Sequence, residues 1–228
     1  MTLAIRARGL TYQHATRPQP AFTGVDLDVE RGERILISGD SGSGKSTLLA
    51  VIAKLIDDSE DGSKTGTLEV NGTVGMVLQD PEAQTILSRV GDDVAFGAEN
   101  LGVPRDEIWR RVEASLEAVG LDLPLDHPTS RLSGGQKQRL ALAGVLAMGA
   151  DILVLDEPTA NLDPRGRDEV INAVDRVCTR TGATLIVVEH RPKHWSHVVD
   201  TYYRLDADGL RRITEDELPQ LPALPPTK

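Results

Sequence analysis

The segment that decides the fold is GDSGSGKST, residues 39–47, which stands between the apolar runs RILIS (34–38) and LLAVIA (48–53). The first run is typical of a strand and the second of a helix. Glycines let backbone N–H groups curve around an anion, and the helix N-terminus adds positive potential. A lysine and a serine at the end of such a loop reach the terminal phosphates and magnesium. A plain Gly/Ser turn explains this context less well, so we predict a nucleoside-triphosphate site at Gly39, Asp40, Ser41, Gly42, Ser43, Gly44, Lys45, Ser46 and Thr47.

Length and charge limit the class of protein. The 228 residues suit one substantial α/β domain. A formal charge of −10, from 35 acidic and 25 basic side chains, argues against a sequence-independent nucleic-acid binder. The single cysteine, Cys178, allows no internal disulfide, and the N-terminus lacks the order of a signal peptide, so we expect a cytosolic chain. No apolar run approaches the roughly 20 residues of a membrane span.

Periodicity outlines the remaining elements. Residues 3–29 alternate apolar and polar positions, which predicts antiparallel strands, and a second strand pair is expected at 67–70 and 74–78. The acidic stretch 57–62 is interpreted as a solvated loop because Leu68 stands where a calcium loop has its bidentate glutamate. The Pro-rich residues 215–228 are expected to form a tail or linker.

The middle of the chain, from about 82 to 148, has a helical character. A helix over 106–119 would place Ile108, Val112, Leu116 and Val119 on one face and stop at Gly120. Apolar runs at 151–155 and 183–188, with a helical stretch over 164–180 between them, indicate a crossover between parallel strands. We therefore predict an α/β fold: a mostly parallel core sheet, an N-terminal antiparallel β-subdomain and an inserted helical subdomain.

Two carboxylates follow the buried run 152–155. Ligands of open α/β sheets bind at the carboxyl ends of the strands, so Asp156 and Glu157 are expected at a site and not on an ordinary surface. Asp156 can hold hydrated magnesium, and Glu157 can polarise a water that attacks the γ-phosphate.

A third motif, LSGGQKQR at 132–139, leads into the helical run 140–143. Its glycines permit close backbone approach, and the helix N-terminus would face a phosphate. Alone it could be a Gly-broken helix start. Beside the phosphate loop and Asp156-Glu157, it makes the chain resemble the nucleotide-binding subunit of ATP-binding cassette (ABC) proteins from Leu3 to about Ile213, with the ABC domain over 1–214.

The resemblance implies roles for further residues. Tyr12 matches the aromatic that stacks on adenine, Gln79 the glutamine that contacts magnesium and the attacking water, and His190 the histidine that touches the γ-phosphate. Asp163, in the sequence Asn161-Leu162-Asp163, matches a loop that communicates across a dimer. The run that closes over ATP held by a second chain corresponds to Ser133, Gly134, Gly135 and Gln136.

Residues 79–84, 90–102 and 188–191 resemble the energy-coupling factor (ECF) importers of vitamins or of cobalt and nickel. That likeness implies ATP and Mg²⁺ as ligands and a second ABC ATPase chain as partner. It also implies a transmembrane coupling protein that binds near Gln84 and Phe96, and a separate membrane protein that binds the substrate. No nucleic acid is expected, and the chain would lie at the cytoplasmic face of the membrane. Another importer or exporter subunit is the nearest alternative. A soluble ABC ATPase acting on DNA or ribosomes fits less well, because the sequence has neither the long coiled coils of the DNA-repair members nor the second cassette of the ribosome-acting members. A regulatory module with a degenerate site also fits less well, because the expected site residues are all present.

Two departures from the family stand out. Only residues 71–73 separate the two strands expected at 67–70 and 74–78. Beyond about Glu215 the further C-terminal domain of many relatives is lacking, as in a compact member or one half of a tandem polypeptide. A metal site at His190, His194 and His197 is less favoured than a switch histidine followed by two surface histidines, because Pro192 disturbs the spacing. Cys178 is expected to pack in the core.

Overall fold

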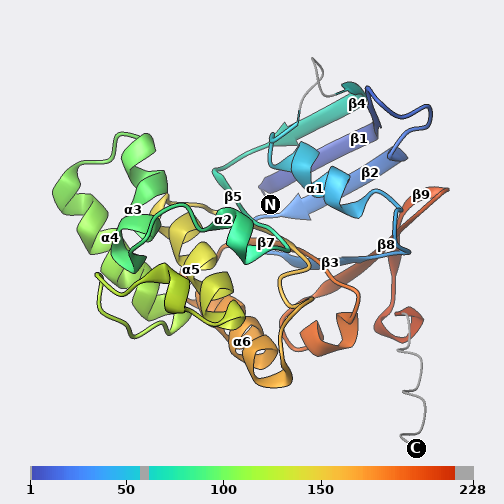
Figure 1. Ribbon diagram of the computed structural model, residues 1–228. Coiled ribbons are helices and arrows are strands. Elements are labelled where there is room, and N and C mark those ends of the chain that lie inside the picture. The colour runs from blue at the N-terminus through green and yellow to red at the C-terminus, as the bar shows by residue number, and fades with distance from the viewer. Residues whose placement is uncertain (1, 57–61, 219–228) are drawn as a thin grey trace, which may run out of the picture.

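Two β-sheets and a group of helices make up the computed structural model, which describes residues 2–56 and 62–218 (Figure 1). The first sheet is antiparallel, with the order β2-β1-β4. The second sheet has the order β5-β6-β7-β3-β8-β9, and all its pairings are parallel except β8 with β9. The strands are β1 (Leu3–His14), β2 (Phe22–Glu30), β3 (Arg34–Ser38), β4 (Gly62–Val70), β5 (Val74–Val77), β6 (Ile152–Asp156), β7 (Thr184–Val188), β8 (Thr201–Asp206) and β9 (Gly209–Ile213).

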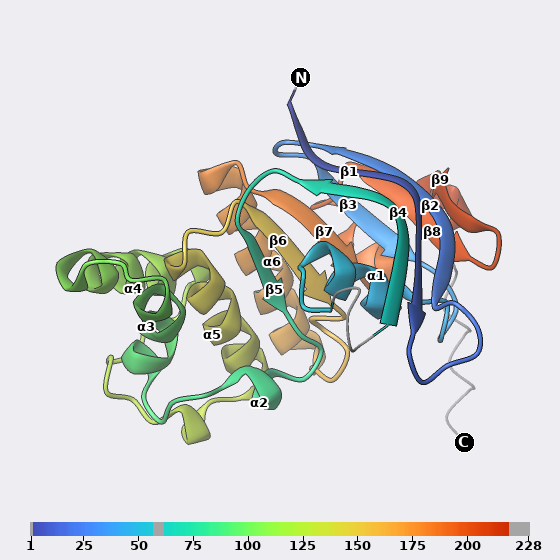
Figure 2. The same cartoon turned by 90° about the horizontal axis from the view of Figure 1, so that it is seen from above.

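The central strands of the second sheet, β3, β6 and β7, are buried on both faces, so their alternating side chains enter two different cores. Ile35 and Ile37 of β3 pack with the antiparallel sheet and with α1 (Lys45–Ile52). Leu36 belongs to the opposite core, with the helices of the other face. Figure 2 shows α1 between the two sheets. This layering explains why the central strands β3, β6 and β7 have nearly continuous apolar sequences.

The other helices lie on the far face of the parallel sheet and beyond its β5 edge (Figures 1 and 2). They are α2 (Pro81–Gln84), α3 (Val90–Asn100), α4 (Arg105–Val119), α5 (Gly134–Ala147) and α6 (Pro164–Thr181), with short 3₁₀ turns at Thr129–Arg131, Pro192–Trp195 and Glu215–Glu217. The helix predicted over 106–119 is confirmed, and Gly120 ends it with a φ of 67°. Of the helices in the described part of the chain, none has the length and apolarity needed to cross a bilayer.

The α/β fold and the β6–α6–β7 crossover are confirmed, but the second strand pair is wrong. β4 pairs with β1, whereas β5 pairs in parallel with β6 in the other sheet. The short connection is held at the start of β6, because the N–H of Thr73 donates to Asp151 Oδ2 at 3.1 Å. A Cβ at Gly72 would lie 2.5 Å from the same oxygen, so the chain passes there only as glycine.

The C-terminal boundary also differs from the prediction. Residues 215–217 form a 3₁₀ turn capped by Thr214, and Leu218 is buried, so the ordered fold continues past the expected start of the tail. The rest of the predicted tail, 219–228, and most of the predicted acidic loop, 57–61, lie outside the described residues.

Candidate functional site

The phosphate loop joins β3 to α1 and depends on its glycines. Gly39, Gly42 and Gly44 all have positive φ, of 153°, 80° and 93°. A Cβ at Gly44 would lie 2.1 Å from the carbonyl oxygen of Ala21, and glycine alone fits this left-handed position. The loop backbone is thereby wrapped around the N-terminus of α1, the geometry that binds phosphate.

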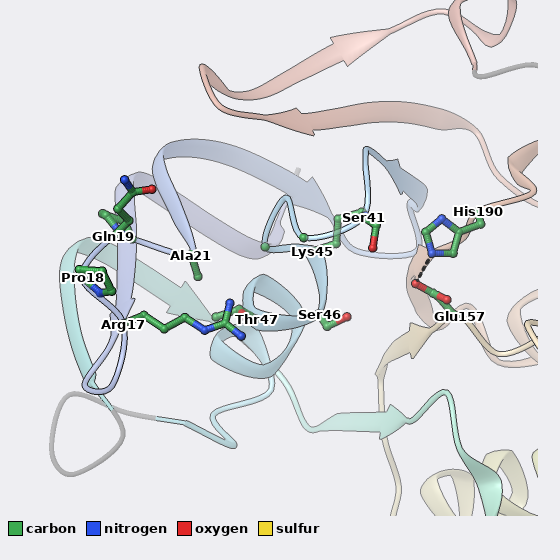
Figure 3. Close-up of a pocket in the computed structure, with 13 residues that line it drawn as sticks. Arg17, Pro18, Gln19, Ala21, Ser41, Lys45, Ser46, Thr47, Glu157 and His190 are labelled. Atoms are coloured by element: carbon green, nitrogen blue, oxygen red, sulfur yellow. Dashed lines mark ion pairs between the residues drawn. The ribbon is translucent and has the colours of Figure 1, made fainter.

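Lys45, the first residue of α1, is buried at the base of a cleft of about 470 Å³. Its Nζ donates to the carbonyl oxygens of Gly39 at 2.9 Å and Asp40 at 2.8 Å. Burial lowers the pKa of Lys45, while nearby carboxylates act in the opposite direction. Figure 3 shows the cleft, which is lined by Arg17, Pro18, Gln19, Pro20, Ala21, Ser41, Gly42, Gly44, Lys45, Ser46, Thr47, Glu157 and His190.

Asp156 and Ser46 meet at the floor of this region. Asp156 ends β6, and its Oδ1 accepts a hydrogen bond from Ser46 Oγ at 3.0 Å. Burial raises the pKa of Asp156, and the Ser46 hydrogen bond and the charge of Lys45 oppose that rise. A carboxylate and a hydroxyl held together are the oxygen donors that Mg²⁺ prefers. These two residues therefore fit a magnesium ion bound beside the phosphates.

Glu157 and His190 both line the cleft, and their side chains lie next to each other. Glu157 Oε1 lies 2.8 Å from His190 Nε2 (Figure 3). Glu157 adopts a φ of 47°, and its N–H donates to the carbonyl of Val188 at 2.9 Å. A left-handed glutamate is strained backbone, and the neighbouring strand holds it in place. The side chain is thus directed out of the strand line and into the cleft.

The expectation that Tyr12 stacks on adenine is contradicted. Its side chain is 0% exposed and packs in the core between the two sheets, so no base can reach it. His14, two residues further along β1, is only partly buried and lies 3.1 Å, Nε2 to Oγ1, from Thr47 of the phosphate loop. Arg17 lines the cleft and extends toward Thr47 (Figure 3). Neither His14 nor Arg17 was predicted as a site residue, because the family pattern pointed to an aromatic side chain in this part of the chain.

Gln79 is exposed beyond β5, and it does not line the described cleft. Its carbonyl accepts from Gln138 Nε2 of α5 at 3.3 Å, so the backbone is tied to the helix that follows the LSGGQ run. Gln84 is used locally: its Oε1 accepts from the N–H of Leu78 at 2.6 Å, and its Nε2 donates to the carbonyl of Met76 at 2.9 Å.

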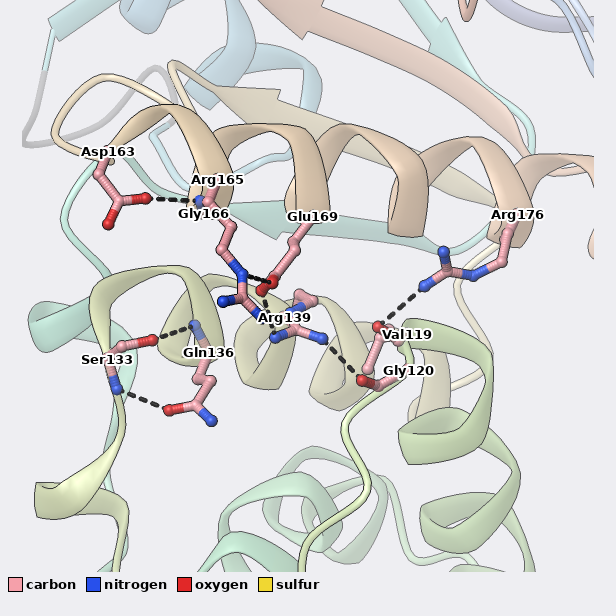
Figure 4. Close-up of polar contacts among 10 residues, drawn as sticks. All are labelled: Val119, Gly120, Ser133, Gln136, Arg139, Asp163, Arg165, Gly166, Glu169 and Arg176. Atoms are coloured by element: carbon pink, nitrogen blue, oxygen red, sulfur yellow. Dashed lines mark hydrogen bonds and ion pairs between the residues drawn. The ribbon is translucent and has the colours of Figure 1, made fainter.

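The LSGGQ run forms a second surface (Figure 4). Ser133 caps α5: its Oγ accepts from the N–H of Gln136 at 3.3 Å, and Gln136 Oε1 accepts from the N–H of Ser133 at 2.8 Å. Asp163 caps α6 through the N–H of Gly166 at 2.6 Å. Together with Arg139, Arg165 and Glu169, these side chains line a separate hollow that shares no residue with the phosphate-loop cleft.

Comparison with known proteins identifies the chain. The ABC transporter family model matches residues 22–160. The chain belongs to the ABC transporter family. This ABC protein is 40% identical over 202 residues to the energy-coupling factor transporter ATP-binding protein EcfA1 of Caldanaerobacter subterraneus subsp. tengcongensis, covering 83% of this chain and 73% of that one.

The ABC chain is also similar to a solved structure and to a longer relative. It superposes on cbiO1 from Clostridium perfringens, part of the ABC transporter complex cbiONQ, with a TM-score of 0.81 and 31% identity, covering 92% of this chain and 88% of that one. It is 42% identical over 200 residues to a relative from Methanosarcina mazei assigned to the ABC transporter ATP-binding proteins, covering 82% of this chain. The chain spans only 34% of that relative's length.

Proposed function

We propose that this chain is the ATP-hydrolysing subunit of a membrane transporter, of the ECF importer type. The main observation behind the proposal is that one cleft is lined by the phosphate loop, Lys45 and the Glu157–His190 pair. Ser46 of this cleft donates a hydrogen bond to Asp156. The similarity to EcfA1 and to cbiO1 supports the ECF type.

The reaction follows from the residues of this cleft. The phosphate loop and Lys45 bind the β- and γ-phosphates and offset their charge. Glu157 accepts the proton of the attacking water, and His190, held at 2.8 Å from Glu157, donates to the γ-phosphate. In-line attack then releases phosphate, and the rate enhancement comes mainly from positioning and charge neutralisation.

Ser46 and Asp156 would hold Mg²⁺ in this scheme, with Gln79 as a further ligand once its segment moves toward the cleft. When bound, such an ion would offset the negative charge that develops on the phosphate oxygens in the transition state. Ser46 lies in the first turn of α1 and Asp156 at the end of β6, and these positions support the assignment.

A second ABC chain completes each nucleotide site. The hollow beside the LSGGQ run shares no lining residue with the cleft of the same chain, which supports a role for Ser133 to Gln136 at a nucleotide bound by another copy or a related chain. The exposed N-terminus of α5 would then meet the γ-phosphate held by Lys45 of the partner. Two nucleotides are thereby enclosed between two chains.

The segment from α2 to α3 is the proposed contact with a transmembrane coupling protein. Ile86 and Leu101 flank α3 and are 60% and 57% exposed, so both offer apolar surface to a partner. Asp93 Oδ1 accepts from the N–H groups of Ile86 and Leu87 at 2.8 and 2.7 Å, which fixes the segment against α3. In this scheme the chain sits on the cytoplasmic face of the membrane through its partner, and a separate membrane protein binds the transported compound.

The test is capture of the partner with a Glu157→Gln chain, tagged and expressed in its own host and solubilised gently with MgATP. We expect a small polytopic membrane protein to co-purify. Adding Ile86→Glu should abolish that capture and leave ATP-dependent dimerisation intact. Leu55→Glu, at a leucine of 59% exposure after α1, is the matched control and should retain the partner. Recovery with ribosomes or DNA-processing proteins would overturn the transport proposal, and recovery of a large exporter subunit would overturn the ECF type.

A further inference from the structure

A buried carboxylate lies directly beside the catalytic pair. Glu189 precedes His190 and is only 3% exposed. Its Oε1 accepts two hydrogen bonds from one residue, at 2.6 Å from the hydroxyl of Thr159 and at 3.1 Å from its N–H. Burial raises the pKa of Glu189, and the hydrogen bonds from Thr159 oppose that rise. Burying a carboxyl group is costly unless its oxygens are hydrogen-bonded, so the contact with Thr159 is what makes this position tolerable.

Thr159 belongs to the segment that connects β6 to α6, residues 157–163. This segment is also held by its own backbone: the N–H of Ala160 donates to the carbonyl of Glu157 at 3.1 Å, and that of Leu162 to the carbonyl of Thr159 at 3.3 Å. Glu189, which directly follows β7, therefore acts as a clamp: its hydrogen bonds to Thr159 hold the short turn that begins at Glu157.

The far end of the same segment touches the LSGGQ surface. A Cβ at Gly134 would lie 3.1 Å from Leu162 Cδ2, and one at Gly135 would lie 3.1 Å from the Cα of Gly166, so the Leu162 side chain and the first turn of α6 lie close against the start of α5. Figure 4 shows Asp163 at the start of α6, above Ser133 at the start of α5. The contacts thus run without a gap from His190 and Glu189, through Thr159 and Leu162, to Gly134.

We infer that Glu189 is a positioning residue for ATP hydrolysis: through Thr159 it fixes the 157–163 segment, so that Glu157 and the surface offered to a second chain keep one geometry. The inference rests on the proposed ATPase function. Glu189 does not line the cleft, so it acts through the residues that it holds. Catalytic groups must be held to within a fraction of an ångström, and a loop residue such as Glu157 needs this support from a neighbouring element.

The kinetic test compares variants on both sides of the contact in the full-length chain. Glu189→Ala and Thr159→Val should each lower kcat by about tenfold or more and change KM for ATP by less than about twofold, since they disturb geometry and not binding. Glu189→Gln and Thr159→Ser keep an acceptor and a hydroxyl, and they should restore most of the rate. The Glu189→Ala/Thr159→Val double variant should be no slower than the slower single variant.

Glu33→Ala is the matched control. Glu33 accepts from the hydroxyl of Thr201 at 3.1 Å and from the N–H of Glu30 at 2.9 Å, at the opposite end of the parallel strands, and its loss should leave kcat unchanged. Equal losses in Glu189→Gln and Glu189→Ala would overturn the positioning role, because the charge and not the hydrogen bonds would then matter. So would an unchanged kcat in Glu189→Ala.

Hydrogen exchange measured by mass spectrometry tests the clamp without any turnover. Glu189→Ala should speed amide exchange in the 158–163 peptide by about tenfold or more, because the Thr159 N–H loses its acceptor, while the phosphate-loop peptide stays protected. Unchanged exchange in the 158–163 peptide would overturn the inference. A wild-type chain that shows this protection but neither binds nor hydrolyses ATP would overturn the proposed function instead.

Discussion

The imidazole Nε2 of His190 lies 2.8 Å from Oε1 of Glu157, and the two residues leave neighbouring parallel strands at the same edge of the sheet. Asp156 pairs in register with Val188, so Glu157 lies one position beyond this pair on one strand and His190 two positions beyond it on the other. The carboxyl edge of a parallel sheet is where ligands bind, and here it brings a carboxylate and an imidazole to the cleft lined by the phosphate loop.

Replacing Glu157 by glutamine tests that pair. The amide cannot accept a proton from water, so kcat should fall by about 100-fold or more while ATP binding persists. The bound nucleotide should then hold two chains together, and size-exclusion chromatography with light scattering should find an ATP-dependent dimer. Turnover at the wild-type rate would rule out Glu157 as the general base.

Replacing Lys45 by alanine separates binding from stability. The Kd for ATP, measured by calorimetry, should rise by about tenfold or more because a charge-assisted contact with the phosphates is lost. Burial already lowers the pKa of Lys45, which means that the folded chain holds this ammonium at a cost. Its hydrogen bonds to the carbonyls of Gly39 and Asp40 offset that cost, so Tm without nucleotide should change little, and a fall in Tm with unchanged Kd would contradict this assignment.

Local patterns account for what could be predicted from the sequence. The phosphate loop lies within one strand–loop–helix unit, and the α4 stripe and its Gly120 stop depend on residues a few positions apart. The Asp156-Glu157 pair follows a strand that is apolar on both faces, so its place at the sheet edge follows from the run itself.

The errors arose where the answer depends on distant contacts. Tyr12 and His14 are two positions apart on β1, so alternation puts both on one face, and only the packing of distant elements buries Tyr12 and leaves His14 beside Thr47. The predicted pairing of β5 with β4 was wrong because the turn at 71–73 is held by Asp151, which lies 78 positions after Thr73 in the sequence. Glu189 was missed as a clamp because its partner Thr159 is 30 positions away.

The correction at Tyr12 can be tested by comparing it with Arg17. Tyr12→Ala should destabilise the fold by about 3 kcal/mol, as expected for loss of a buried aromatic, with little specific change in ATP affinity at temperatures where the variant is folded. Arg17→Ala should leave Tm unchanged and weaken ATP binding, because this cation lines the cleft beside Thr47. Denaturant unfolding and calorimetry measure the two effects. Weaker binding in Tyr12→Ala alone would restore the adenine role.

Cys178 should behave as a packing residue. It is 1% exposed, and burial raises the pKa of its thiol to about 11. At pH 8 the native thiol is then almost wholly protonated, and the thiolate is the reactive form. Iodoacetamide should label the unfolded chain within minutes and the native chain far more slowly, at a rate that rises with pH. Rapid labelling of the native chain at pH 8 would show an open environment instead.

Complementation between two inactive variants tests the site shared by two chains. Ser133→Arg places a bulky cation at the N-terminus of α5, where it blocks the partner's nucleotide, and leaves the variant's own cleft intact. Lys45→Ala disables its own cleft and keeps a normal LSGGQ surface. Each variant alone should be inactive, whereas an equal mixture should recover about a quarter of wild-type activity, since half of the dimers are mixed and each mixed dimer has one complete site. A mixture no more active than its components, with mixed dimers demonstrated by mass spectrometry, would show that the LSGGQ run does not complete a neighbour's site.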